Sequence, residues 1–260
     1  MKKKKAFTLI ELLVVIAIIA LLLSIIVPSL GKAKDYAKRT LCMSNVRQIG
    51  LGLKIYAQSN DDILLPLTEL SGTIRPWTAV VAYTGGPTDP TPVHLAHLYE
   101  LGLIETPEVF YCPAQNRNSD YPYPYYYDFY TQNGSWGSYI PDQGGGHDFV
   151  RTSYNYWTYQ KKRMTELHAT KPLIVDNLQE WEVVPHRKGR LSASVAPGTP
   201  NPSALPQGVT ALFADGHVNF CISSDIFDKS LWPLQNGYSN GPGNRKDSFL
   251  EILRVIEGHQ

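Results

Sequence analysis

The hydrophobic pattern of the chain begins with four lysines at positions 2–5, followed by a mainly apolar run over residues 6–30. The run exceeds the roughly 20 residues that a membrane-spanning helix needs. Glu11 lies inside it, although an acidic side chain costs about 2.5–3.5 kcal/mol at the centre of a spanning helix. We therefore expect Glu11 to have a specific partner. The lysines predict that the N-terminus stays in the cytoplasm and that the chain after Leu30 is exported.

Amphipathic periodicity continues beyond the apolar run. Apolar residues recur every three or four positions up to Tyr56, with lysines and arginines between them, which is typical of a helix with one buried face. We predict one helix over 7–58, about 80 Å long at 1.5 Å per residue, with a transmembrane half at 7–30 and an amphipathic half at 31–58. Residues 59–62 are predicted to end it.

Residues 59–260 are predicted to form a globular, β-rich extracytoplasmic domain. The pattern favours a short helix at 94–101, a strand or short helix at 77–83, and strands at 109–112, 153–159 and 173–176. Residues 113–150 are rich in Tyr, Pro, Gly and Asn, which predicts an exposed excursion. The tyrosine run at 121–130 fits either a loop laid over the sheet or a contact surface for a partner or glycan.

Two strand-like runs at 209–222 flank the pair Asp215-Gly216. We predict a hairpin closed by a type I′ turn, in which both central residues have positive φ. Residues 248–256 are predicted to form an amphipathic helix that packs back on the sheet. The expected fold class is α+β, with a long N-terminal helix on a small antiparallel sheet with long loops.

Composition narrows the function. A chain of 260 residues with 43% hydrophobic content can hold one globular domain and the helix. The net charge of +1 includes the four lysines at 2–5, so the exported part is slightly negative and nucleic acid is not an expected partner. No nucleophile elbow, His-Glu-x-x-His or Walker loop is present. We therefore predict a protein that is not an enzyme.

The string Lys5-Ala6-Phe7-Thr8-Leu9-Ile10-Glu11-Leu12-Leu13 strongly resembles the prepilin peptidase site of type IV pilins and type II secretion pseudopilins. The resemblance implies that a leader peptide, residues 1–6, is cut off between Ala6 and Phe7, and that Phe7 is then N-methylated. It implies that Glu11 pairs with the N-terminal amine of a neighbouring subunit during assembly. Pro28 stands where the family often has a helix-kinking proline, and Ala6 stands where it usually has Gly.

This resemblance implies a structural subunit of a type IV pilus-like or type II secretion pseudopilus filament. Its expected partners are copies of itself or other pilin-like subunits, prepilin peptidase and an inner-membrane assembly platform. The expected location is a single pass through the inner membrane, with a periplasmic C-terminal domain. One alternative is a membrane-anchored binding module or enzyme that uses the same export signal. Another is an ordinary signal peptide cut near Ser29 and Gly31.

Scattered motifs at Leu41–Gly50, Tyr111–Pro113 and Leu212–Val218 resemble large pilin-like families of planctomycete- and verrucomicrobia-type bacteria. Those families share a C-terminal Asp-Gly-His signature, and in them nine residues separate an upstream histidine from the Asp-Gly pair. Leu205 occupies that position here, and His186 is the nearest upstream histidine.

Candidate chemistry rests on cysteines, histidines and aspartates. In an oxidising compartment one disulfide is expected, with Cys42 and Cys112 as the preferred pair, and three buried thiols as the alternative. A divalent metal site is considered at His186, Asp215 and His217, with Asp176 as a further ligand, although the turn alone explains Asp215. Calcium at Asp225 or Asp228 is a family-level alternative. No cofactor is otherwise expected.

Overall fold

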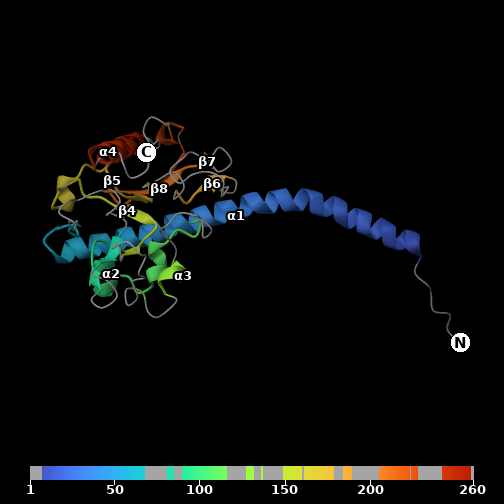
Figure 1. Ribbon diagram of the computed structural model, residues 1–260, viewed down its shortest axis with the longest axis horizontal. Coiled ribbons are helices and arrows are strands. Elements are labelled where there is room, and N and C mark those ends of the chain that lie inside the picture. The colour runs from blue at the N-terminus through green and yellow to red at the C-terminus, as the bar shows by residue number, and fades with distance from the viewer. Residues whose placement is uncertain are drawn as a thin grey trace. The chain divides into compact units, whose positions relative to one another are not determined.

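The computed structural model describes residues 8–67, 81–84, 90–115, 127–131, 136, 149–159, 161–178, 184–188, 205–222, 224–227 and 242–258. The chain forms two compact units, residues 1–38 and 39–260. One helix, α1 (Leu9–Ser59), contributes to both (Figure 1).

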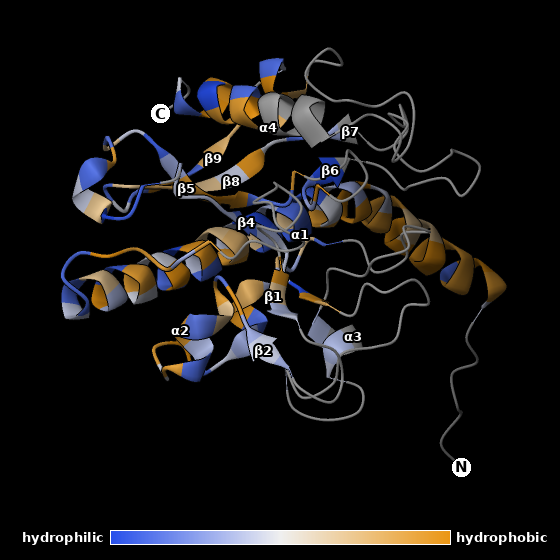
Figure 2. Ribbon diagram, turned by 60° about the vertical axis from the view of Figure 1, so that its left-hand side comes forward, coloured by the Kyte–Doolittle hydropathy of each residue, from blue (hydrophilic) through white to orange (hydrophobic). Residues whose placement is uncertain are grey.

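The first unit holds the apolar half of α1. Every residue from Thr8 to Ala37 is exposed within the single chain, and Figure 2 shows the N-terminal part of α1 coloured mostly as hydrophobic. The helix is long and apolar enough to cross a membrane. It continues through Pro28, whose missing N–H leaves one helical hydrogen bond unmade. The predicted long N-terminal helix is confirmed.

The second unit is built on an antiparallel sheet in the order β4-β5-β8-β9. Its strands are β4 (Tyr154–Tyr156), β5 (Pro172–Asp176), β8 (Val209–Phe213) and β9 (Val218–Cys221). A second sheet has the order β2-β1-β3, from β2 (Thr91–Pro92), β1 (Val81–Thr84) and β3 (Val150–Arg151). A two-stranded pair joins β6 (Arg187–Lys188) to β7 (Leu205–Pro206).

Short helices complete the described part of this unit. They are α2 (Ala96–Glu100), η2 (Pro107–Phe110), α3 (Tyr127–Tyr130), η3 (Met164–Glu166), η5 (Asp225–Phe227) and α4 (Pro242–Glu257). The mixture of helices and antiparallel strands confirms the predicted α+β class.

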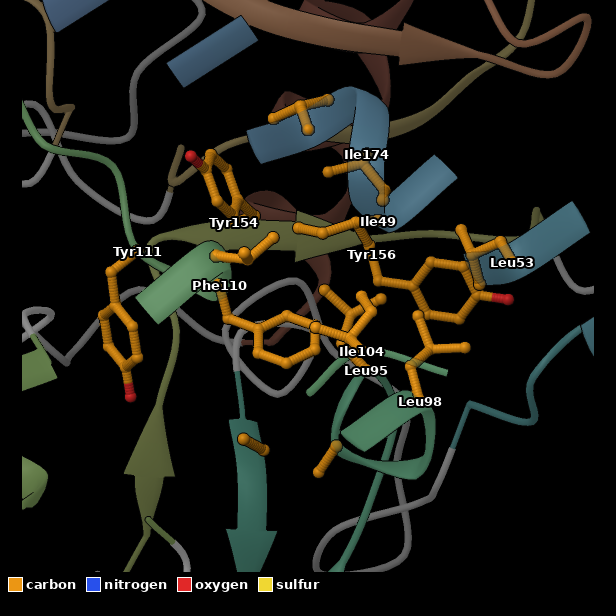
Figure 3. Close-up of a cluster of buried hydrophobic side chains, with 14 of the residues drawn as sticks. Ile49, Leu53, Leu95, Leu98, Ile104, Phe110, Tyr111, Tyr154, Tyr156 and Ile174 are labelled. Carbon is orange, nitrogen blue, oxygen red and sulfur yellow. The ribbon is translucent and has the colours of Figure 1, made fainter. Parts of the chain in front are cut away.

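The four-stranded sheet separates two hydrophobic clusters, because alternate residues of a strand point to opposite faces. On one face, Ile174 and Leu212 join the buried stripe of α1 that includes Ile49 and Leu53. Figure 3 shows side chains of this cluster, to which α2 contributes Leu98 and η2 contributes Phe110. On the other face, Val175, Ala211 and Phe213 lie beneath α4, which buries Phe249, Ile252, Leu253 and Ile256.

Two glycines of α1, Gly50 and Gly52, face neighbouring elements of the domain. A Cβ atom at Gly50 would lie 2.8 and 2.9 Å from the two methyl carbons of Leu212. A Cβ atom at Gly52 would lie 3.4 Å from Ile104 and Leu98, which is normal van der Waals contact. Gly50 therefore permits the approach of α1 to β8, and the two glycines have different packing roles.

The hairpin between β8 and β9 is confirmed, but its predicted type I′ turn is wrong. Gly216 has φ of 97°, whereas Asp215 does not have positive φ. The N–H of Gly216 donates to Phe213 O at 2.8 Å, and that of Phe213 donates to His217 O at 2.9 Å. This is a three-residue loop, a type I turn followed by a glycine bulge. Asp215 instead accepts the N–H of His217 with its carboxylate, at 2.9 Å.

Two further expectations differ from the structure. The strand predicted at 109–112 is absent: Val109 and Phe110 belong to the 3₁₀ helix η2, and residues 111–112 are in no strand, because Pro107 favours the start of a helix. The excursion at 113–150 is not exposed throughout, since Tyr130 and Trp136 are buried. The Trp136 ring stacks on Phe110 with centroids 5.1 Å apart. Most of the tyrosine run at 121–130 lies outside the described residues.

Candidate functional site

The start of α1 carries the first candidate site. Ala6 and Phe7 lie outside the described residues, so the description begins at Thr8. The backbone N–H and the hydroxyl of Thr8 both donate to Glu11 Oε2 at 2.8 Å, and the N–H of Glu11 donates to Thr8 Oγ1 at 3.3 Å. This reciprocal arrangement is a capping box, which satisfies N–H groups that a helix start leaves unpaired. Glu11 therefore has a local partner within the single chain.

The second candidate site is a buried cluster of polar side chains in the globular unit. Cys42, Cys112, Asp176 and His186 each direct one ligand-type atom to a common point, and these atoms all lie within 4.8 Å of one another. All four residues are buried. They come from α1, from the segment after η2, from the end of β5 and from the residue before β6.

Local structure explains how these four side chains meet. Cys42 continues the buried stripe of α1 that includes Val46, Ile49 and Leu53. Asp176 follows Ile174 by two positions and therefore points to the same face of the sheet, toward α1. The carbonyl of His186 accepts the N–H of Gln207 at 2.8 Å.

Specific contacts connect the four residues. Cys112 Sγ lies 3.4 Å from His186 Nε2, and Cys42 Sγ lies 3.5 Å from Asp176 Oδ1. His186 Nε2 is 3.7 Å from Asp176 Oδ2. Around them, Thr210 donates its N–H to Asp176 Oδ2 at 2.6 Å and its hydroxyl to Cys42 Sγ at 3.4 Å. The Tyr154 hydroxyl is 3.3 Å from Cys42 Sγ.

The low polarity of the surroundings controls the electrostatics of the cluster. Burial raises the pKa of Asp176 to about 7, against the lowering effect of the Thr210 N–H. Burial also raises the pKa of the Cys42 thiol well above its usual value, and the nearby Asp176 carboxylate adds to this. Both groups are thus destabilised as anions unless a cation is present. Two sulfurs, an imidazole and a carboxylate form a donor set that can hold a divalent metal.

The metal ligands considered from the sequence do not converge as a set. Asp215 and His217 lie at the tip of the β8–β9 hairpin, where Asp215 Oδ1 is 2.7 Å from His217 Nδ1. His186 lies 3.5 Å from Thr210, near the other end of β8. At 3.3 Å per residue, that end is roughly 15 Å from the hairpin tip. The structure instead places His186 with Asp176.

The two cysteines of the predicted disulfide lie together in this cluster. All three cysteines of the chain are buried thiols in the structure, so the pairing of Cys42 with Cys112 stays a prediction. Cys221 belongs to the core beneath α4. Of the aspartates considered for calcium, Asp225 lies in η5 and Asp228 lies outside the described residues.

Comparison with known families supports the first site. Residues 1–27 match the model of the prokaryotic N-terminal methylation motif. The match includes Ala6, Phe7 and Glu11 and indicates a type IV pilin-like or pseudopilin-like substrate of prepilin peptidase. Comparisons with curated proteins and with solved structures gave no match.

Proposed function

We propose that this chain is a structural subunit of a type IV pilus-like or type II secretion pseudopilus filament. The observation that supports the proposal best is the methylation motif at residues 1–27 on a helix whose apolar side chains are exposed around its whole circumference. Such a helix is stable only when lipid or other helices cover it. We propose that lipid covers it before assembly and neighbouring subunits cover it afterwards.

The proposed processing step prepares the chain for assembly. Prepilin peptidase would hydrolyse the peptide bond between Ala6 and Phe7, which removes the four lysines and frees the amine of Phe7. That amine would begin the helix one turn before Glu11. Because a charge is costly in lipid, a carboxylate on one subunit and an amine on its neighbour are both stabilised when they pair. Pairing would require Glu11 to leave or share its hydrogen bonds with Thr8.

The proposed location follows from the same features. The lysines at 2–5 would hold the precursor's N-terminus in the cytoplasm, residues 7–30 would cross the inner membrane, and the globular domain would lie in the periplasm. In the filament, the helix would form the core and the domain would form the surface. The expected partners are pilin-like subunits, prepilin peptidase and the assembly platform.

Substitution of Glu11 tests this function. Gln can accept the hydrogen bonds of the capping box but carries no charge, whereas Ala removes both. If the charge drives assembly, Glu11→Gln and Glu11→Ala should both enter the membrane and both fail to enter filaments. Filament incorporation can be measured by sheared-fraction immunoblots and by the ladders that an amine-reactive crosslinker forms through exposed lysines of α1 such as Lys32 and Lys34. Wild-type ladders from Glu11→Gln would contradict charge pairing and favour the lone membrane-anchored module.

A further inference from the structure

The buried cluster of Cys42, Cys112, Asp176 and His186 has no role in membrane insertion or in the pairing of Glu11. Each residue comes from a different segment of the chain, and the outermost pair is separated by 144 positions (186 − 42). Four polar side chains meet at one point within a core that is otherwise mostly apolar. We propose that these residues form a structural zinc site in the globular domain.

The distances between ligand atoms fit a tetrahedral ion. With Zn–N and Zn–S bonds of about 2.0 and 2.3 Å, the edges of a coordination tetrahedron measure about 3.3 to 3.8 Å. Cys112 Sγ lies 3.4 Å from His186 Nε2, and Asp176 lies 3.5 Å from Cys42 Sγ through Oδ1 and 3.7 Å from His186 Nε2 through Oδ2. All remaining pairs of ligand atoms lie within 4.8 Å. The cluster therefore needs little rearrangement to surround one ion.

The donor set selects zinc among common divalent ions. Thiolate sulfur is a poor ligand for calcium and magnesium, which prefer oxygen, and two sulfurs with one imidazole favour zinc. Four protein ligands complete a tetrahedron, so no position remains for a water or a substrate. All four are buried. The proposed ion is thus structural rather than catalytic.

Neighbouring groups already orient the ligands. Thr210 contacts both Asp176 and Cys42 through its N–H and its hydroxyl, and the Tyr154 hydroxyl can donate to Cys42 Sγ. The His186 ring meets the Phe220 ring edge to face, with centroids 5.0 Å apart. Hydrogen bonds and packing of this kind fix ligand orientation around metal sites and raise metal affinity.

Two metal-free arrangements compete with zinc. In a disulfide between Cys42 and Cys112 both sulfurs would be uncharged and could no longer bind a metal. In a metal-free network of thiols the Asp176 carboxyl and the His186 ring stay buried 3.7 Å apart, and burying such polar groups costs free energy that their mutual attraction repays only in part. A zinc ion instead binds the two thiolates and the carboxylate together and offsets two of their three negative charges. Its ligands would tie α1 to the segment after η2, to β5 and to β6.

Metal content of the full chain tests the proposal. The protein, purified in detergent without chelator or added metal, should contain about one zinc per chain by mass spectrometric elemental analysis. Cys42→Ser and Cys112→Ser should each lower zinc occupancy more than about tenfold. Cys221→Ser is the matched control, because this third buried cysteine lies outside the cluster, and it should retain zinc. Asp215→Asn should also retain zinc.

A spectroscopic measurement guards against variants that fail to fold. When Co²⁺ replaces the native ion, the wild type should show the intense visible bands of a tetrahedral site and the near-ultraviolet band of thiolate bonded to cobalt. The Cys221→Ser control should show the same spectrum. Zinc-free wild-type protein that neither binds zinc nor gives this Co²⁺ spectrum would overturn the proposal. A disulfide between Cys42 and Cys112 in the freshly isolated chain, detected by peptide mass spectrometry, would also overturn it.

Discussion

Gly50 and Gly52 are two residues apart on α1, yet replacing each with alanine should change stability in opposite directions. Alanine in a helix interior is favoured over glycine by about 0.8–1.0 kcal/mol, because glycine loses more backbone entropy on folding. At Gly52 the new methyl group would meet Ile104 and Leu98 at 3.4 Å, so most of this gain should be realised. We expect Gly52→Ala to stabilise the globular domain by up to about 1 kcal/mol.

At Gly50 the new methyl group would lie 2.8 and 2.9 Å from the two methyl carbons of Leu212. Leu212 is itself buried and has little space to move. Overpacking of this kind costs about 1–3 kcal/mol, which exceeds the gain in helix propensity. Gly50→Ala should therefore destabilise the domain, by up to about 2 kcal/mol.

Guanidinium unfolding of the full chain in detergent, followed by tryptophan fluorescence, measures both changes, since Trp136 and Trp157 are buried in the domain. A double-mutant cycle identifies the clash. Leu212→Ala removes the contacted methyl groups, so Gly50→Ala should cost less in that background, with a coupling of about 1–3 kcal/mol. If Gly50→Ala raises the midpoint as Gly52→Ala does, and shows no coupling to Leu212, the packing of α1 on β8 is described wrongly.

Three further predictions concern the hairpin and the helix start. Asp215→Asn should change the thermal midpoint of unfolding little, because an amide oxygen can still accept the N–H of His217. Gly216→Val should lower the midpoint by several degrees, since a β-branched residue is disfavoured at φ of 97°. Equal midpoints for the two variants would argue against the glycine bulge. Thr8→Ala should reduce helix stability by about 1 kcal/mol, because it removes the side-chain cap of α1. Circular dichroism and amide hydrogen exchange in micelles measure this change. Unchanged amide exchange would refute the capping box. Thr8→Ser should behave as the wild type.

Strong local patterns could be predicted from the sequence. The apolar run, the periodicity up to Tyr56 and the polar residues after it predict α1, and the structure ends this helix at Ser59. Asp61 and Asp62 then adopt positive φ, which aspartate tolerates better than most residues. The helix at the C-terminus was also evident, because its apolar residues repeat at helical spacing and bury one face.

Features that depend on distant neighbours were harder to predict. The Asp-Gly pair indicates a hairpin, but turn type depends on the register of β8 and β9, so the type I′ prediction failed. The capping box at Thr8 and Glu11 has a recognisable spacing, but the family resemblance assigns Glu11 to a neighbouring subunit and not to Thr8. The sequence marks Cys42, Cys112 and His186 as candidates, and only the fold brings all three to Asp176.

Processing between Ala6 and Phe7 decides whether this chain is a pilin-like subunit. It can be read by mass spectrometry of the mature protein, isolated from membranes of a host with an active prepilin peptidase. We expect a chain that lacks Met1–Ala6 and begins with N-methylated Phe7, and an uncut precursor when Ala6 is replaced by a bulky residue. A mature chain that begins near Lys32, as an ordinary signal peptidase would produce, would show that the chain is not a pilin-like subunit.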